Sequence, residues 1–395
     1  MNDAVLVINA GSSSIKFAFY SFTTPNSPAL LSGKVVNIGQ SPTLYAINAK
    51  GSDLTDNDLA AFNNQTTHES LIQWLLEWLN HHDQGYKIKA VGHRVVHGGR
   101  DFLTPTKLTV SVVEHLKTLI PLAPLHQPHN LAAIEAIFTW APQLPQVACF
   151  DTSFHSTQPR LAQLFALPRE YSDKGIIRYG FHGISYQYIV SCLPQYLGTF
   201  ANGRVIVAHL GNGASMCALK QRQSVATTMG FTALDGLMMG QRCGSLDAGV
   251  VIHLLRHYKM SIEDVEHMLY NESGLLGVSG ISSNMQVLQQ SNDPQAKQAI
   301  DLFCYRAARE LAALVSTLNG IDAIVFTAGI GENSASIRAQ ICQHLTWLGV
   351  SLDPSKNRQH KSIISQSDSN VKVLVIPTNE EIIIAQATQK LLMAR

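Results

Sequence analysis

Short apolar runs alternate with amphipathic stretches along most of the chain. Runs rich in Val, Ile and Ala predict strands suited to burial on both faces, and they lie at 4–8, 15–20, 89–92, 145–150, 205–210, 322–327 and 371–376. Between them, apolar residues return every three or four positions, which is the period of a helix with one buried face. Because strands alternate with helices, the pattern favours an α/β protein with mixed sheets.

Two of the predicted helices carry clear boundary signals. Thr66 and Glu69 have the spacing of a capping box, and an apolar face follows at Leu71, Trp74, Leu75 and Trp78. A second, longer helix begins at Asp293-Pro294 and ends at Asn319-Gly320, where the asparagine and glycine are typical of a helix end.

Two segments of the chain resemble each other when it is shifted by 200 positions. Residues 5–19 (VLVINAGSSSIKFAF) align without a gap with residues 205–219 (VIVAHLGNGASMCAL). Each segment has an apolar strand, a polar residue (Asn9 or His209), a glycine turn and a second apolar segment. This match near the middle of the chain indicates a duplicated domain, and a cleft between two such domains is a natural binding site.

Composition narrows the class of protein. The chain has 395 residues with 29 Lys+Arg against 28 Asp+Glu, and this near-neutral balance argues against a surface for nucleic acid or an anionic membrane. Six scattered cysteines without a C-x-x-C pair indicate reduced thiols and a cytoplasmic protein. The N-terminal residues lack the basic segment of a signal peptide, and no apolar run is long enough to cross a membrane.

Four glycine loops follow apolar strands, at 9–14, 97–99, 209–214 and 328–333. Glycine lets backbone N–H groups approach phosphate oxygens, and the hydroxyls of Ser12, Ser13 and Ser14 could add donors. Each loop alone is more often structural, and neither a Walker A motif nor a G-x-G-x-x-G fingerprint is present. Several such loops on duplicated halves favour nucleotide binding.

Candidate chemical groups stand at strand ends and turns. Arg94 and His97 follow an apolar strand, where the alternative is a surface arginine and a capping histidine; His126 stands between two prolines and could be a plain loop residue. Asp151 follows a strand at the position where α/β proteins present side chains to ligands. Arg242 lies between glycines, where a buried guanidinium would need an anionic partner.

Two further groups stand where helices are expected to begin. Phe181 and His182 lie at a glycine-flanked turn that leads into a predicted helix. Glu380 and Glu381 cap the last predicted helix, where two acids either complement the helix dipole or hold magnesium.

In their order, these segments resemble the acetate kinase family over nearly the whole chain. The motifs are NAGSSSIKF, GHRVVHGG, APLHQP, FDTSFH, RYGFHG, HLGNGAS, ESGLLGVSG, FTAGIGENS and IPTNEE. The resemblance implies a duplicated two-domain actin-like (ribonuclease H-like) fold with mixed sheets and an interdomain cleft. The expected domains are 1–150, completed by a C-terminal helix at 380–395, and a nucleotide-binding domain at 151–379.

The resemblance also implies an activity: reversible transfer of the γ-phosphoryl group of ATP to a short-chain carboxylate, with acetate as the first choice for this chain, with Mg²⁺ (Mn²⁺ can substitute) and in a homodimer. The implied catalytic residues are Arg94, His126, Asp151, His182 and Arg242, and the implied metal residues are Asn9 and Glu380. The implied substrate pocket is Val96, Leu125, Phe181 and Ala233. The implied nucleotide residues are Lys16, His209, Leu210, Gly211, Asn212, Gly213, Asn284, Met285, Gln286, Gly329, Ile330, Gly331 and Asn333.

Several positions depart from the family's usual residues. Ala226 and Ser245 replace acids, Cys243 replaces a serine next to Arg242, and Ala233 replaces a pocket proline. The segment 284–286 lacks the usual Asp and Arg beneath the adenine, so nucleoside triphosphates other than ATP are plausible substrates. Val96 favours acetate over propionate.

Three alternatives stay open at this point. The first is a propionate kinase, and the second is a paralogue that binds nucleotide without catalysis. The third is a sugar or glycerol kinase of the same architecture, against which the apolar set Val96, Leu125 and Phe181 argues.

Overall fold

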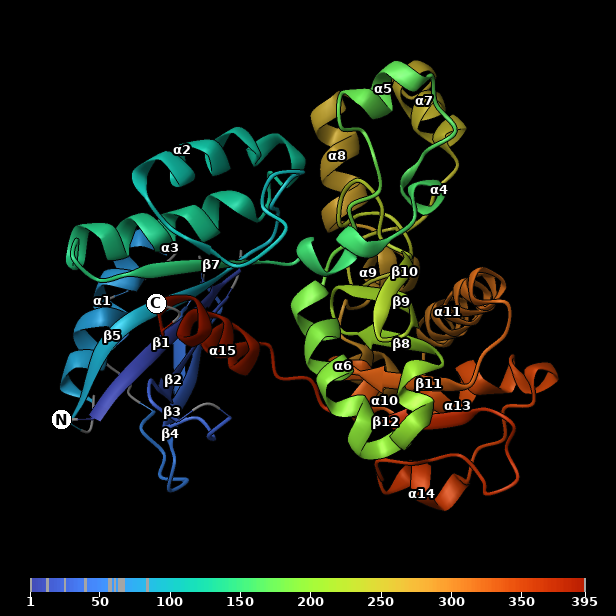
Figure 1. Ribbon diagram of the computed structural model, residues 1–395. Helices are drawn as coiled ribbons and strands as arrows, with labels where there is room; N and C mark the ends of the chain where they lie inside the picture. Colours follow the sequence, from blue (N-terminus) through green and yellow to red (C-terminus); the bar gives the residue numbers. More distant parts are fainter. Residues whose placement is uncertain are drawn as a thin grey trace. The chain divides into compact units, whose positions relative to one another are not determined.

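The computed structural model describes residues 2–11, 14–24, 26–38, 41–55, 59, 62, 68–82 and 85–393. The chain divides into two compact units, each with its own sheet. Unit 1 contains Met1–Ser153 and Asn379–Arg395, and unit 2 contains Phe154–Thr378 (Figure 1). Each unit is described by itself below.

Unit 1 has a seven-stranded mixed sheet in the order β4-β3-β2-β1-β5-β7-β6. Its strands are β1 (Asn2–Ala10), β2 (Ser14–Ser21), β3 (Leu31–Val36), β4 (Thr43–Asn48), β5 (Tyr86–Val95), β6 (Thr106–Lys107) and β7 (Gln146–Phe150). β1 to β4 are successive antiparallel neighbours, whereas β1, β5 and β7 are parallel to one another.

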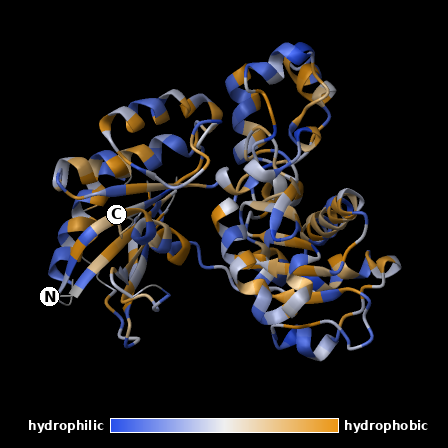
Figure 2. Ribbon diagram, in the orientation of Figure 1, coloured by the Kyte–Doolittle hydropathy of each residue, from blue (hydrophilic) through white to orange (hydrophobic). Residues whose placement is uncertain are grey.

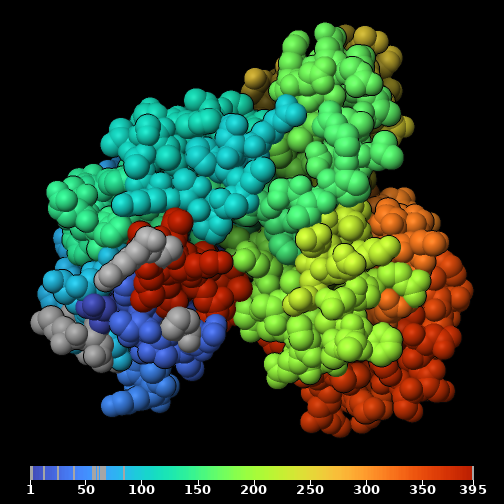
Figure 3. Space-filling view, in the orientation of Figure 1, coloured from blue at the N-terminus to red at the C-terminus, as the bar shows by residue number. Residues whose placement is uncertain are grey.

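Helices cover both faces of the unit 1 sheet. They are α1 (His68–His81), α2 (Val110–Thr118), α3 (Gln127–Trp140) and α15 (Glu380–Met393). The core between α1, α3 and one face includes Leu6, Ile8 and Phe17, and α15 packs on the opposite face, with Ile384 against Gly92 of β5. Figure 3 shows the red atoms of this C-terminal helix packed among the blue and cyan atoms of the N-terminal residues.

Unit 2 repeats the central part of this topology. Its five-stranded sheet has the order β10-β9-β8-β11-β12, with β8 (Arg204–Leu210), β9 (Ala214–Lys220), β10 (Gln223–Thr227), β11 (Ala323–Thr327) and β12 (Lys372–Val375). β10, β9 and β8 are antiparallel neighbours, and β8, β11 and β12 are parallel, as β3, β2, β1, β5 and β7 are in unit 1. This shared order confirms the predicted duplication.

The helices of unit 2 also cover both faces of its sheet. They are α4 (Arg160–Gln163), α5 (Arg169–Asp173), α6 (Gly183–Leu197), α7 (Ala248–Arg256), α8 (Ile262–Asn271), α9 (Gly274–Ser279), α10 (Met285–Gln290), α11 (Pro294–Leu318), α12 (Ala328–Asn333), α13 (Ala335–Gln343) and α14 (Pro354–Arg358). α6 packs its apolar face on Val205 and Val207, while α11 lies on the other side of the sheet. The strands are correspondingly apolar in Figure 2.

Most predicted elements are confirmed. Each of the seven predicted strands is present, and α11 begins after the N-cap Asp293 and ends at Asn319, which adopts the left-handed conformation at φ 57°. In α1, Leu71, Leu75 and Trp78 are buried as predicted. Thr66 of the predicted capping box and the hydroxyls of Ser12 and Ser13 lie outside the described residues.

The gap-free alignment of the two hairpins is wrong by one residue after the turn. Ala10 pairs with Ile15 across four intervening residues, whereas Leu210 pairs with Ala214 across three. The structural counterpart of Lys16 is therefore Ser215, which pairs with His209 as Lys16 pairs with Asn9. The strands of both hairpins are mostly apolar, so their pattern does not show that one turn is a residue longer than the other.

Candidate functional site

In unit 1, the candidate residues meet at the ends of β1, β5 and β7. Asn9 lies near the end of β1, Arg94 near the end of β5 and Asp151 directly after β7. The carboxyl ends of parallel strands share one edge of a sheet, which is where α/β proteins bind ligands. The first residue of α15, Glu380, reaches the same edge.

Arg94 is the centre of this group. Its guanidinium donates to both carboxylate oxygens of Asp151, with Nη2 at 2.5 Å from Oδ2 and Nε at 3.2 Å from Oδ1. Its Nη1 donates to Oδ1 of Asn9 at 3.3 Å, and the Asn9 amide donates to Oε2 of Glu380 at 3.2 Å. One planar cation thereby links three of the predicted residues in a fixed arrangement.

Charge and burial determine the protonation of this group. Burial opposes the positive charge of Arg94, but the facing Asp151 and Glu380 raise its pKa above the ordinary value, so the guanidinium keeps its proton. The pKa of the Glu381 carboxyl is raised, first by burial and then by the neighbouring Glu380, and Lys16 and Arg94 offset part of this rise. The side chain of Asp151 is 1% exposed, and the facing guanidinium of Arg94 stabilises the negative charge of its carboxylate.

The remaining candidates of unit 1 have mixed surroundings. His126 is half-buried at the start of α3, Val96 is buried and Leu125 is half-buried. His97 is fully buried, and its Nδ1 accepts from the Gly99 backbone at 2.9 Å, so it closes the local turn in the capping role considered above. Lys16 is exposed on β2 in this unit, and it is not a lining residue of the cavity described below for unit 2.

In unit 2, a pair of stacked histidines lies between β8 and α6. His182 precedes α6 in the left-handed conformation at φ 58°, a backbone that a non-glycine residue keeps only where its surroundings hold it. Its ring stacks on His209 at 4.2 Å between centroids, and its Nδ1 lies 2.8 Å from the Ser215 hydroxyl. His209 in turn contacts the Ser185 hydroxyl through Nδ1, at 2.9 Å.

Arg242 approaches the same place from a loop. A side chain built on Gly213 would meet Nε2 of His182 at 3.4 Å and Nη1 of Arg242 at 3.8 Å, so these two donors converge on the glycine turn after β8. Arg242 is half-buried and donates to the Ala233 carbonyl at 3.0 Å. The arrangement gives two nitrogen donors beside a turn without a side chain, which suits the oxygens of an anion.

The substituted positions around Arg242 have structural partners. The Ser245 hydroxyl donates to Asp235 at 2.9 Å, and Asp235 pairs with Arg178 at 3.0 Å, so Ser245 orients an acid rather than being one. Burial raises the pKa of the Cys243 thiol, which donates to the Gly244 carbonyl. Ala226 is buried on β10.

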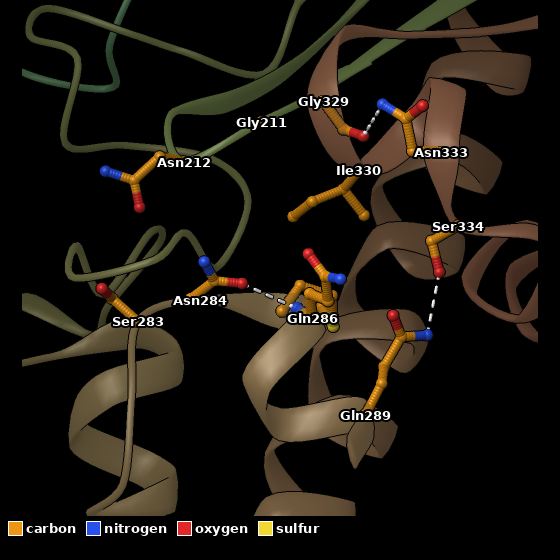
Figure 4. A pocket seen from close by; sticks show the side chains of 11 residues that line it. Gly211, Asn212, Ser283, Asn284, Gln286, Gln289, Gly329, Ile330, Asn333 and Ser334 are labelled. Atoms are coloured by element: carbon orange, nitrogen blue, oxygen red, sulfur yellow. Dashed lines mark hydrogen bonds between the residues drawn. The ribbon is translucent and has the colours of Figure 1, made fainter. Parts of the chain in front are cut away.

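A cavity of 630 Å³ opens in unit 2 beside the end of β8. Its lining contains eight of the predicted nucleotide residues: Gly211, Asn212, Asn284, Met285, Gln286, Gly329, Ile330 and Asn333. Figure 4 shows these residues coming from three segments, the turn after β8, the start of α10 and helix α12. A cavity of this size fits a nucleoside.

Polar but uncharged side chains dominate that cavity. Asn284 caps α10, its Oδ1 accepting from the backbone of Gln286 at 2.8 Å, and Asn333 donates to the Gly329 carbonyl at 2.9 Å (Figure 4). Gln289 donates to Ser334 at 2.9 Å and to Ser336 at 2.6 Å. The eleven lining residues include no Asp, Glu, Lys or Arg, so any ligand there is recognised by amides, hydroxyls and backbone.

Some residues of this region differ from the sequence-based expectation. Ser283, Gln289 and Ser334 line the cavity but were not predicted: Ser334 is the last residue of the FTAGIGENS motif, whereas no motif marks Ser283 or Gln289. His209, Leu210, Gly213 and Gly331 are not among the lining residues: Leu210 and Gly331 are buried, and His209 belongs to the histidine pair. Phe181 is buried and Ala233 is half-buried, both in unit 2.

Comparison with known proteins decides the family. The model of the acetokinase family matches residues 4–386. The chain belongs to the acetokinase family. It is 50% identical over 396 aligned residues to an acetate kinase of Rhodopseudomonas palustris, with 99% of each chain covered. It is 47% identical to an acetate kinase of Nitrobacter hamburgensis, covering 100% of this chain and 97% of the relative.

Solved structures agree with this assignment. A propionate kinase from Francisella tularensis superposes with a TM-score of 0.90 at 37% identity, covering 98% of this chain and 99% of that one. The acetate kinase of Porphyromonas gingivalis superposes with a TM-score of 0.87 at 33% identity, covering 99% and 100%. The predicted duplicated actin-like α/β fold is thereby confirmed.

Proposed function

We propose that this chain reversibly transfers the γ-phosphoryl group of ATP to acetate, giving acetyl phosphate and ADP. The observation that carries the proposal is the guanidinium of Arg94, fixed by Asp151 and Asn9 at the edge of the sheet, in a member of the acetokinase family. Acetate is ionised at neutral pH, so its oxygen needs no general base. The obstacle is the repulsion of two anions, which fixed cations reduce.

The arginines and histidines of the candidate site each have a role in this proposal. Arg94 and Arg242 bind the acetate carboxylate and the phosphoryl group in transit, because their planar forks match such oxygens. His182 donates to the phosphoryl oxygens, and the stack with His209 and the contact with Ser215 orient its ring. His126 supports the same charge. Asp151 orients Arg94.

The oxygens near Arg94 fit a magnesium ion carried by the nucleotide. The carboxylate of Glu380 and the amide oxygen of Asn9 lie on one hydrogen-bonded path, and hard oxygen donors of this kind are what Mg²⁺ prefers. Within the described part of the chain no three His, Cys, Asp or Glu side chains form a metal cluster. An ion at Asn9 and Glu380 would take its other ligands from waters and phosphate oxygens. When bound, the ion neutralises phosphate charge, and Mn²⁺ would substitute for it.

The cavity of unit 2 is the proposed adenosine site. Asn284, Gln286, Gln289 and Asn333 can each present a donor or an acceptor to a base, because an amide carries both. ATP is therefore the first choice of nucleotide, and GTP and ITP are expected to be used less efficiently rather than rejected. Lys16, His209 and Gly213 are assigned to the phosphates.

Val96 and Leu125 of unit 1 and Phe181 and Ala233 of unit 2 are the residues proposed to contact the methyl group of acetate. Propionate is the runner-up, because a solved propionate kinase is among the similar structures and Ala233 leaves more space than a proline. A hydroxamate assay with acetate, propionate and butyrate, each with ATP and Mg²⁺, separates these readings. We expect kcat/KM to be highest for acetate. Nucleotide binding by calorimetry without any acyl phosphate would favour a non-catalytic paralogue instead.

We further propose a cytoplasmic homodimer. All six cysteines are unpaired, which suits a reducing compartment, and none of the described helices is long and apolar enough to cross a membrane. Helix α7 has no buried residue, and its apolar side chains Val250 and Ile252 are 41% and 50% exposed. A second copy of the chain would cover these side chains. Analytical ultracentrifugation should find a dimer, and Ile252→Asp should shift it toward monomer.

A further inference from the structure

Arg338 of α13 is the largest fully buried side chain in the described residues, and most of its hydrogen-bond partners are carbonyl and amide oxygens. Its Nη1 donates to the carbonyls of Gly331 and Glu332, both at 2.8 Å. Its Nε and Nη2 donate to the side chain and the carbonyl of Asn357, also at 2.8 Å. The remaining donor faces Nδ1 of His360 at 3.2 Å.

These contacts hold the end of helix α12, which supplies three residues to the nucleotide cavity. A helix leaves its last carbonyls without intrahelical partners, and in the six-residue α12 this affects Gly331 and Glu332. One guanidinium nitrogen of Arg338 donates to both carbonyls, and another donates to Asn357. Asn357 lies in the last turn of α14, so Arg338 links the end of α12 to α14. The cavity residues Gly329, Ile330 and Asn333 lie on either side of these carbonyls.

The opposite end of α12 is held as well. The Glu332 carboxylate accepts from the backbone of Ala328 at 2.7 Å and of Thr378 at 3.0 Å. Ala328 has the left-handed conformation at φ 65°, which a residue with a Cβ keeps only under such restraint. A helix this short is marginal by itself, so its position depends on these side chains.

We propose that Arg338 is a positioning residue for the nucleotide: it fixes α12 so that Gly329, Ile330 and Asn333 form one wall of the cavity. The inference rests on the proposed use of that cavity for adenosine. Burying an arginine among neutral groups is costly, and an apolar side chain would suffice for packing alone. Burial lowers the pKa of Arg338 to about 10, so it stays charged at neutral pH.

The test uses Arg338→Lys and Arg338→Met in the full chain. Lysine keeps the charge but cannot reach both α12 and Asn357 in a fork, and methionine keeps only the packing. For both variants we expect the Kd for ATP by calorimetry and the KM for ATP to rise about tenfold, the equivalent of one charged hydrogen bond. The KM for acetate should stay within twofold of the parent.

Arg204→Met is the matched control. Arg204 also joins separate segments of unit 2, donating to Asp322 and to the Asn319 carbonyl, but none of these residues lines the cavity. It should lower the melting temperature while leaving the Kd for ATP unchanged. If Arg338→Met does not fold, Asn357→Ala removes only the acceptor of Arg338 Nε and one donor to Ala335, and should raise the Kd for ATP about threefold.

The outcomes separate this inference from the proposed function. Unchanged ATP binding in folded Arg338→Lys and Asn357→Ala would overturn the inference, and so would an equal rise of both Michaelis constants. A parent protein that binds ATP but makes no acyl phosphate would overturn the function alone, and weaker ATP binding by the variants would still support the role of Arg338.

Discussion

The hairpins β1–β2 and β8–β9 share a backbone plan but present different chemistry. In each, a polar residue stands near the end of the first strand and a glycine turn follows, closed by a hydrogen bond from Gly11 to Ser14 or from Gly211 to Gly213. In each, the polar residue contacts the start of a helix on the same face: Asn9 meets Glu380 of α15, and His209 meets Ser185 of α6.

The difference lies in charge. Around Asn9 the contacts lead to Arg94, Asp151 and Glu380, whereas around His209 they lead to an imidazole and hydroxyls. The cavity next to the second hairpin is lined without any Asp, Glu, Lys or Arg. The duplicated hairpins therefore keep a polar residue at the same place in each sheet. The neighbouring side chains differ: Arg94, Asp151 and Glu380 form an ionic group in unit 1, whereas in unit 2 the histidine pair has Arg242 as its nearby charge and the adjacent cavity has an uncharged lining.

The largest effect is expected from Arg94→Met in the ionic site. Losing the guanidinium removes charge stabilisation from the substrate and removes the cation that pairs with the buried Asp151, so kcat/KM should fall by about 10³-fold. A hydroxamate assay measures this loss. ATP binding to unit 2, followed by calorimetry, should change little.

Arg222→Met is the control for that variant, because Arg222 is exposed and donates to the Asn202 side chain, and neither residue lines the cavity of unit 2. It should keep parental activity. Turnover by Arg94→Met within tenfold of the parent would break the distinction between an ionic and a neutral site.

A smaller effect, common to both units, is expected from acid. Burial lowers the pKa of His93 in unit 1 and of His155 in unit 2 to about 4. Both rings are therefore neutral when folded but protonate near pH 6.5 when unfolded, so the stability they contribute is complete above that pH and is lost as the pH falls toward 4. At pH 5, each of these two histidines should lower the free energy of unfolding by on the order of 2 kcal/mol.

Urea unfolding at pH 7.5 and pH 5 measures that loss. His93→Gln removes one titrating ring and should show a smaller decrease of the unfolding free energy than the parent. An identical decrease in the variant would mean that His93 is not held neutral by burial.

Glu380→Gln tests the proposed metal role within unit 1. The amide retains the size of the side chain but removes a charge, so the Mg²⁺ concentration that gives half-maximal rate should rise about tenfold. The KM for acetate should change less. A variant with the parental Mg²⁺ dependence would restrict Glu380 to capping α15.

The smallest effect is expected from Gly240→Ala beside the neutral cavity. A Cβ there would clash with Oδ1 of Asn212, so the Asn212 amide must move, and the KM for ATP should rise about threefold. Asn212→Ala provides the comparison, since it removes the same amide directly. An unchanged KM in both variants would show that Asn212 does not contribute to nucleotide binding.

The sequence predicted the buried parts of this fold well. Strands such as β8 and β11 are apolar on both faces, so their pattern is unambiguous, and α11 carries boundary signals at both ends. Strand β3 and its neighbour at the sheet edge, β4, contain Ser, Gly, Lys and Asn and were not predicted, because half-exposed strands have a weaker pattern. The apolar pattern also does not give the length of a turn, and the alignment of the two hairpins was therefore wrong by one residue.

The site was predictable where chemistry and motif coincide. Arg94, Asp151, His182 and Arg242 stand beside glycines or at strand ends. The structure brings Arg94 to Asp151 in unit 1, and it brings His182 and Arg242 to the turn at Gly213 in unit 2; their roles in the reaction stay predictions. Gln289 could not be found in this way, because only the packing of α10 near α12 brings it to Ser334. Arg338 was missed for a related reason, since its role arises from backbone carbonyls.

The most direct test of the central claim uses acetate labelled with ¹⁸O in its carboxylate, incubated with ATP and Mg²⁺ and followed by ³¹P NMR. If the carboxylate oxygen attacks the γ-phosphorus, acetyl phosphate forms with ¹⁸O in the bridge between carbon and phosphorus, together with an equal amount of ADP. The isotope shift of the acetyl phosphate resonance reports this bridge. ADP and unlabelled inorganic phosphate without labelled acetyl phosphate would contradict the account.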